Sequence, residues 1–256
     1  MPTVQFAFAN LLESALGGGT TVTVTDAASG NPKEHLYDRD LVFPWKAANA
    51  SGDKAINIDQ GASGAFKIDT ALIAGHNLAG LTCFLEHSPD NSVWSGYDGG
   101  AGSFVATAGT IELSVSGGPL TKRYWRLRMT SPTSAPEVGE LFLTEQKTFE
   151  RNYRFGAAWG KAPNITVLRG PSGAAFKAKR GATQKTLEIE VANVPTSFKE
   201  TLLAEEAAGG DGLKPFWFWD LDAGARRYWM ELVRPVQAVL ASDGRWNIKL
   251  ILREAN

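Results

Sequence analysis

The chain has 256 residues, of which 43% are hydrophobic and 21% charged. This length suits one large or two ordinary domains, and the composition excludes a disordered or a membrane-embedded protein. No apolar run approaches the roughly 18 residues that cross a bilayer. The single cysteine, Cys83, excludes an internal disulfide framework and a cysteine-based zinc site, and we expect it to be buried.

Charge is unevenly distributed along the chain, although the net charge is only −1. Residues 1–147 carry 10 Lys and Arg against 15 Asp and Glu, whereas residues 148–256 carry 16 against 12. This asymmetry favours two domains and suggests complementary surfaces between neighbouring copies. It is too small to indicate a nucleic-acid partner, which would need a concentrated basic face.

The first 19 residues hold a short apolar segment, Phe6 to Leu16, followed by Gly17–Gly19. This segment is either an arm that packs on a neighbour or the first edge of a sandwich. The start has no basic region followed by a long apolar run, so we predict no secretory signal.

Alternation of apolar and polar residues predicts several strands in the first half of the chain. The clearest is Lys122–Met129, where Trp125, Leu127 and Met129 share one face and Tyr124, Arg126 and Arg128 share the other. This pattern is typical of a half-buried antiparallel sheet. Other strands are expected in residues 20–25, 55–59, 68–74, 83–87 and 110–115.

Four motifs in this half of the chain together resemble the discoidin-like family, the galactose-binding-like fold of coagulation-factor C-terminal domains and many carbohydrate-binding modules. The motifs are Asn57–Gly61, Ser88–Trp94, Arg123–Leu127 and Gly139–Leu143. The resemblance implies a jelly-roll β-sandwich over residues 1–147. It also implies a binding rather than a catalytic role.

Relatives in this family bind sugars with loops at one end of the sandwich. By resemblance, the candidate carbohydrate-binding residues are Arg39 and Trp45 in the first loop, His76 and Asn77 in the second, and Tyr97 after the third. Each of these residues also has a purely structural interpretation. For His76, a hydrogen bond to the backbone of its turn is the favoured one.

Many relatives also hold a structural calcium ion, for which Asp38 and Glu140 are the candidate ligands by resemblance. Here Arg39 stands where the family has glycine, and Phe43 stands where it has threonine. Phe43 removes an oxygen ligand and Arg39 adds a repelling charge, whereas calcium requires about six to eight oxygens. We therefore expect no metal ion and no other cofactor.

The second half, residues 148–256, holds five of the eight tryptophans. Strands are predicted at 186–191, 215–220, 227–233 and 245–253, and one helix at 197–208, with Ser197 and Glu200 at capping-box spacing. These features predict a β-sandwich or barrel with one short α-helix, so the whole chain is expected to be all-β. The aromatic run 215–220 suits a strand covered by its own core and by a partner, or the thick aromatic core of a monomer.

The pattern of aromatic and alternating apolar residues in this second half resembles that of the terminal domains of bacteriophage tail-tip and minor tail proteins. The resemblance implies a structural component of a tail tip or baseplate, made in the host cytoplasm and located in the virion tail. Its partners would be copies of itself in a ring, other tail-tip proteins and a host surface glycan. No catalytic motif is found, so we expect no enzyme; the alternative is a stand-alone, non-catalytic carbohydrate-binding protein.

Overall fold

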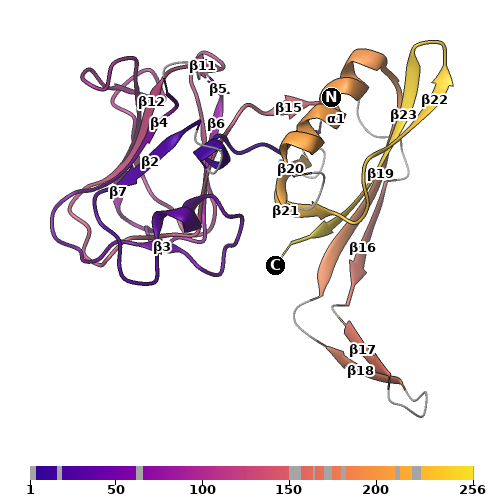
Figure 1. Cartoon of the computed structure of the whole chain (residues 1–256), viewed down its shortest axis with the longest axis horizontal. Coiled ribbons are helices and arrows are strands. Elements are labelled where there is room, and N and C mark those ends of the chain that lie inside the picture. Colours follow the sequence, from indigo (N-terminus) through magenta and orange to yellow (C-terminus); the bar gives the residue numbers. More distant parts are fainter. Residues whose placement is uncertain are drawn as a thin grey trace. The chain divides into compact units, whose positions relative to one another are not determined.

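The computed structural model describes residues 4–15, 19–61, 66–149, 157–163, 165–169, 175–179, 183–210, 214–220 and 226–255. The chain divides into two compact units, one formed by Ala9–Gln146 and the other by Met1–Phe8 together with Lys147–Asn256 (Figure 1). Both units are built from antiparallel strands, and the described residues contain a single α-helix. The predicted all-β fold class is therefore confirmed. No helix in the described part of the chain has the length and apolarity of a membrane span.

The first unit is a jelly-roll-like sandwich with one large and one small main sheet. The large sheet has the order β2 (Thr21–Val24), β4 (Lys54–Asp59), β12 (Tyr124–Met129), β7 (Thr82–Ser88) and β8 (Ser95–Gly96), with β9 (Ser103–Val105) also paired to β7. The small sheet has the order β10 (Ile111–Ser114), β6 (Thr70–Ala74) and β14 (Glu140–Thr144). Two strand pairs complete the unit, β11 (Leu120–Thr121) with β5 (Lys67–Ile68) and β13 (Glu137–Val138) with β3 (Trp45–Lys46).

Strand β12 has the two-faced character that its sequence predicts. Trp125, Leu127 and Met129 are fully buried in the core, whereas Tyr124, Arg126 and Arg128 are only half-buried on the outer face. Because side chains alternate along a strand, the register with β4 and β7 places the outward residues of all three strands in rows. Cys83 is fully buried, as expected, and burial raises the pKa of its thiol to about 12.

The second unit is organised around an eight-stranded sheet. Its order is β15 (Lys147–Thr148), β1 (Gln5–Ala7), β20 (Phe216–Asp220), β21 (Arg226–Leu232), β23 (Arg245–Glu254), β19 (Gln184–Pro195) and β16 (Ala158–Ala162), with β22 (Gln237–Ser242) also paired to β23. A separate pair is formed by β17 (Ile165–Arg169) and β18 (Ala175–Lys179). The core of this unit includes Phe6, Phe198, Phe216 and Phe218.

The first strand belongs to the second unit, which differs from the sequence-based division at residue 147. Strand β1 pairs with β15 on one side and with β20 on the other. Phe6 is buried against Phe8 and Phe149, with ring centroids 5.3 and 5.0 Å away. The first unit is thus inserted between two adjacent strands of the second unit. Strand β1 is therefore neither an arm on a neighbour nor an edge of the jelly roll, while Leu11–Ala15 forms a 3-10 helix of the first unit. Residues 16–18 of this segment lie outside the described residues.

The aromatic strand β20 is buried at all five positions within the single chain. Phe216 and Phe218 belong to the core, while Trp217 lies on the other face and packs against Trp229 with ring centroids 4.8 Å apart. Burial of this strand therefore needs no partner copy. Of the two sequence-based interpretations, the thick aromatic core fits the structure.

The helix α1 (Thr196–Ala208) starts one residue earlier than predicted, after Pro195 as N-cap. Its N-cap makes no side-chain hydrogen bond, so the expected capping box at Ser197 is wrong. At the other end, the Gly209 N–H donates to the Glu205 carbonyl, and Gly210 adopts φ +90°. This positive φ is the reason that a glycine ends the helix.

Candidate functional site

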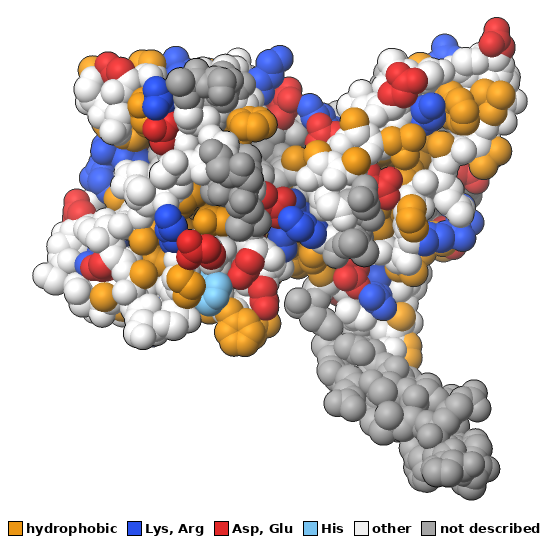
Figure 2. Space-filling view, in the orientation of Figure 1, with side chains coloured by type: hydrophobic (Ala, Val, Ile, Leu, Met, Phe, Trp, Pro, Cys, Tyr) orange, Lys and Arg blue, Asp and Glu red, His pale blue; other side chains and the backbone are white. Residues whose placement is uncertain are grey.

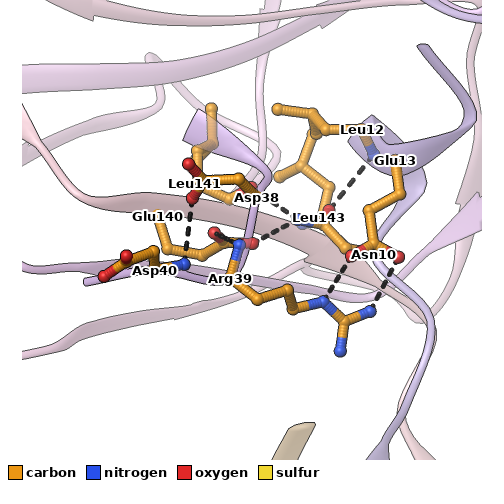
Figure 3. A network of polar contacts seen from close by, with 9 residues as sticks. All are labelled: Asn10, Leu12, Glu13, Asp38, Arg39, Asp40, Glu140, Leu141 and Leu143. Carbon is orange, nitrogen blue, oxygen red and sulfur yellow. Dashed lines mark hydrogen bonds and ion pairs between the residues drawn. The ribbon is translucent and has the colours of Figure 1, made fainter. Parts of the chain in front are cut away.

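A buried polar network joins the N-terminal segment of the first unit to its small sheet (Figure 3). The side chain of Asn10 donates to the Leu141 carbonyl (3.0 Å) and accepts from the Leu143 N–H (3.1 Å). It also donates to a carboxylate oxygen of Glu140 (2.8 Å), which is fully buried. Asn10 therefore satisfies backbone groups at the edge of β14 in the way that a further strand would.

Arg39, the first candidate for carbohydrate binding, lies inside this network. Its guanidinium makes a two-point ion pair with Glu13, at 2.5 and 2.9 Å, and lies over the Phe142 ring at 4.9 Å. Its side chain is only 1% exposed. Arg39 also adopts φ +66°, a left-handed backbone conformation that favours glycine. In this conformation, a ligand does not reach the guanidinium.

Glu140, a candidate calcium ligand, has both carboxylate oxygens occupied by protein donors. One accepts from Asn10, and the other accepts from the backbone N–H of Arg39 at 3.0 Å. Burial raises the pKa of Glu140 well above its ordinary range, opposed by the charge of Arg39. The other candidate, Asp38, accepts from the Asp40 N–H at 2.9 Å. In the described ranges, no three or more His, Cys, Asp or Glu side chains are grouped to hold a metal ion.

Trp45, the second candidate in the first loop, is fully buried in the jelly-roll core. Its indole N–H donates to the Asp26 carbonyl at 3.2 Å. Its backbone pairs with Val138 in the β3–β13 ladder. The structure thus gives Trp45 a packing role, and its ring offers no surface to a sugar.

His76 and Asn77 lie in the turn between β6 and β7, and both side chains make hydrogen bonds with backbone groups. His76 accepts from the Leu78 N–H through Nδ1 at 3.2 Å, the backbone role that its sequence favours. Burial lowers the pKa of His76, which keeps the ring neutral and able to accept. Asn77 donates to the Ala135 carbonyl (3.0 Å) and accepts from the Glu137 N–H (2.9 Å), so it braces this turn against the loop after β12.

An open groove of about 500 Å³ lies between these two loops. Its lining consists of backbone together with small polar and apolar side chains, namely Asn77, Leu78, Ala79, Gly80, Leu81, Thr82, Thr130, Ser131, Pro132, Thr133, Ser134 and Pro136. None of these side chains carries a charge. The groove can therefore offer hydroxyl, amide and backbone hydrogen bonds, but it contains no acid, base or nucleophile of raised reactivity.

Tyr97 lies apart from the groove, along the outer edge of β7. Its backbone N–H donates to the Leu85 carbonyl, and its ring packs edge-on against Phe104 with centroids 6.4 Å apart. Burial raises the pKa of its hydroxyl. Of the five candidate residues, the structure therefore brings only Asn77 into the groove lining, with His76 beside it. The binding role of His76, Asn77 and Tyr97 stays a prediction, whereas Arg39 and Trp45 are buried in this structure.

The remaining groove residues were not among the sequence-based candidates. The signal was present in the run Thr130–Pro136, whose hydroxyl and proline residues follow the strongest strand of the chain. Such a run indicates a loop but not that a second loop faces it. The position of the second loop depends on the antiparallel pairing of β12 with β7. This pairing places the C-terminal end of β12 beside the N-terminal end of β7.

Comparisons with known proteins find similar solved structures, whereas no family model and no curated protein matches the sequence. A Ruminococcus gnavus GH29 fucosidase in complex with fucose is 16% identical with a TM-score of 0.45, and the match covers 56% of this chain and 27% of the fucosidase. The CpGH89CBM32-6 module produced by Clostridium perfringens is 19% identical with a TM-score of 0.42, covering 53% of this chain and 98% of the module. A chitosan-binding module from a Paenibacillus sp. IK-5 chitosanase/glucanase is 13% identical with a TM-score of 0.42, covering 55% and 98%.

Proposed function

We propose that this chain is a non-catalytic carbohydrate-binding protein, and that its jelly-roll unit binds a neutral saccharide in the groove between the β6–β7 turn and the β12–β13 loop. The observation that carries this proposal is the uncharged, hydroxyl-rich lining of a groove of about 500 Å³. A volume of this order accommodates a small saccharide.

The chemistry of the lining fits a sugar better than it fits an ion or an apolar ligand. Thr133 and Ser134 carry hydroxyls that both donate and accept, as sugar hydroxyls require. The Thr130 hydroxyl donates to the Thr82 carbonyl and can still accept. Leu81 and Pro132 supply apolar contacts for the C–H faces of a pyranose ring. An ionic ligand would find no side-chain charge to compensate its loss of water.

A catalytic role at this groove is disfavoured by the same lining. Glycoside hydrolysis ordinarily uses two carboxyl groups that flank the scissile bond. The side chains that line the groove include no Asp or Glu. Binding without bond cleavage is the function that these groups support.

The test is a glycan array followed by titration calorimetry with the neutral saccharides that bind. Thr133 is exposed in the groove lining, so Thr133→Trp would fill the groove without disturbing the core. We expect this variant to lose binding by tenfold or more, a loss of about 1.4 kcal/mol or more. Thr121→Trp is the matched control, because Thr121 is exposed on β11, outside the groove lining. Equal binding by wild type and Thr133→Trp would reject the groove as the site.

A second candidate function is that of a structural component of a phage-type tail tip, in which the second unit assembles into a ring. The observation that favours it is the exposed strand β22, where Val239 and Leu240 are 66% and 58% exposed. Exposed apolar edge strands are templates for pairing with another chain. Other tail-tip proteins and a host surface glycan would then be further partners.

Light scattering over a range of protein concentrations tests this second candidate. Ring assembly predicts a mass that is a multiple of 27.5 kDa and that falls with Val239→Lys, because a charge at this edge blocks strand pairing. Val42→Lys, which places the same charge at an exposed residue of the first unit, is the control. A monomer at all concentrations would count against assembly and leave carbohydrate binding untouched.

A further inference from the structure

The outer face of the large jelly-roll sheet presents two arginines of β12, and each lies on an aromatic ring. The guanidinium carbon of Arg126 is 4.0 Å from the Trp94 ring centroid, and that of Arg128 is 4.0 Å from the Phe84 centroid. Their side chains are 24% and 27% exposed. Stacking on the rings restricts both guanidinium groups, so they are oriented before any ligand arrives.

Glu86 lies between the two arginines and fixes them from the neighbouring strand. It accepts from Arg126 Nε at 2.6 Å and from Arg128 Nη2 at 3.2 Å. Burial favours the neutral form of Glu86, but these hydrogen bonds outweigh it and hold the pKa of the carboxyl below its ordinary value. Two positive charges therefore share one buried negative charge.

The positive charge of this pair remains directed toward solvent. Among the described residues, Arg126 is bonded through Nε alone, which leaves its two Nη groups available. The other nearby carboxylate, Asp53, is 3.8 Å from Arg128 Nη1 and 51% exposed, so solvent screens it strongly. Lys and Arg side chains gather at the left margin of this unit in Figure 2.

Uncharged polar side chains continue the row on the strands beyond β12. The register places Asn57 of β4 opposite Arg126, and Thr23 of β2 opposite Asn57. Thr23 is exposed and Asn57 is half-buried. A row of hydroxyl, amide and guanidinium groups can take sugar hydroxyls beside an anionic group.

We propose that this face is a second binding site, specific for an acidic saccharide. Arg126 and Arg128 bind its carboxylate or sulfate group, and Asn57 and Thr23 bind neighbouring hydroxyls. The site differs from the loop-end groove in both position and charge. A failure of the neutral-sugar proposal would therefore leave this proposal unaffected, and the reverse holds too. Preorganised guanidinium groups suit such anions because little rotational freedom is lost on binding.

The experiment measures binding of the full chain to oligogalacturonate, which carries carboxylates, and to dextran sulfate, with neutral dextran as the blank. The double variant Arg126→Gln and Arg128→Gln should bind the anionic probe at least tenfold more weakly. Arg253→Gln removes one charge from an arginine of the second unit that is 45% exposed and paired with Glu231, and it should bind as wild type does. Glu86→Gln should bind several-fold more tightly, because it removes the competing negative charge.

These outcomes separate a site from a structural network. Binding of only one probe would identify whether the site takes a carboxylate or a sulfate group. Binding of both probes would show that the site accepts either group. Wild type that binds neither probe at low salt, or a loss shared equally by Arg253→Gln, overturns the proposal. If the double variant fails to fold, Arg126→Lys, which keeps the charge but loses the planar stack, should still weaken binding measurably. Undiminished binding by this folded variant would also contradict the proposal.

Discussion

At the residue scale, Arg39 shows how burial gives a structural role to a residue that the sequence suggests as a ligand. Arg39 adopts a left-handed backbone conformation, with φ +66°, that non-glycine residues rarely adopt. The strain is offset by the ion pair with Glu13 and by the hydrogen bond from the Arg39 N–H to Glu140. The arginine thus holds the first loop against the buried network.

Arg39→Met should lower the free energy of unfolding by about 3–5 kcal/mol, because it removes the buried guanidinium that makes an ion pair with the nearly buried Glu13 carboxylate. Lys46→Met is the matched control, since it breaks an ion pair with Glu137 that is 42% and 31% exposed and should cost about 1 kcal/mol or less. Urea denaturation of the three proteins measures both changes. Similar losses for the two variants would show that Arg39 is not part of a buried network.

The buried Glu140 predicts a specific pH dependence of stability. Its folded pKa is raised by burial, so its contribution is present below the unfolded pKa near 4.5 and is lost as pH rises through the folded value. Glu140→Gln removes this pH-dependent contribution to the free energy of unfolding. The stability of wild type relative to this variant should therefore fall with rising pH, by up to about 1.4 kcal/mol per pH unit within the window.

For Asp26 we expect the opposite dependence of stability on pH in the same experiment. A hydrogen bond from Lys54, which is 2% exposed, lowers the pKa of Asp26. Its contribution is present above the unfolded pKa of 3.8 and is lost as pH falls, so wild type should lose stability relative to Asp26→Asn on acidification. Parallel pH profiles for the two variants would contradict these assignments.

At the element scale, strand β1 ties the beginning of the chain into the second unit. It fills the place between β15 and β20, and Phe6 contributes to the core there. The first-half strands could be predicted because their alternation is local. The placement of β1 could not, because a three-residue strand gains its pairing from residues about 140 and 210 positions later in the chain.

Phe6→Ala should destabilise the second unit by about 3–5 kcal/mol through a cavity in its core. The jelly-roll unit has its own core and should be unaffected. Hydrogen exchange distinguishes the two units: amides of β20 and β23 should lose protection, while those of β4 and β12 keep it. Loss of protection in β12 as well would show that the units do not have separate stabilities.

At the scale of the whole molecule, the fold class could be predicted from sequence more completely than the site. Periodic strands such as β12 and β23 identify an all-β chain, and four motifs in order indicate the jelly roll. Arg39 and Trp45 resemble loop ligands in sequence, but their burial gives them structural roles. Burial of a loop residue depends on what the rest of the chain places over it, and a motif does not contain that information.

The groove likewise arises from two loops that are about 50 residues apart in sequence, brought together by the pairing of β7 with β12. Its uncharged lining is the basis for proposing a neutral saccharide as ligand. The arginine pair on the outer face is the basis for proposing an acidic saccharide at a second position.

The most direct test of the central proposal is an NMR titration of the isotope-labelled chain with a neutral saccharide that binds on the array. We predict that the largest amide shift changes fall on Asn77, Leu81, Thr130 and Thr133, and that they vanish in Thr133→Trp. Shift changes confined to residues outside the two groove loops, or unchanged spectra at saturating saccharide, would contradict the proposal.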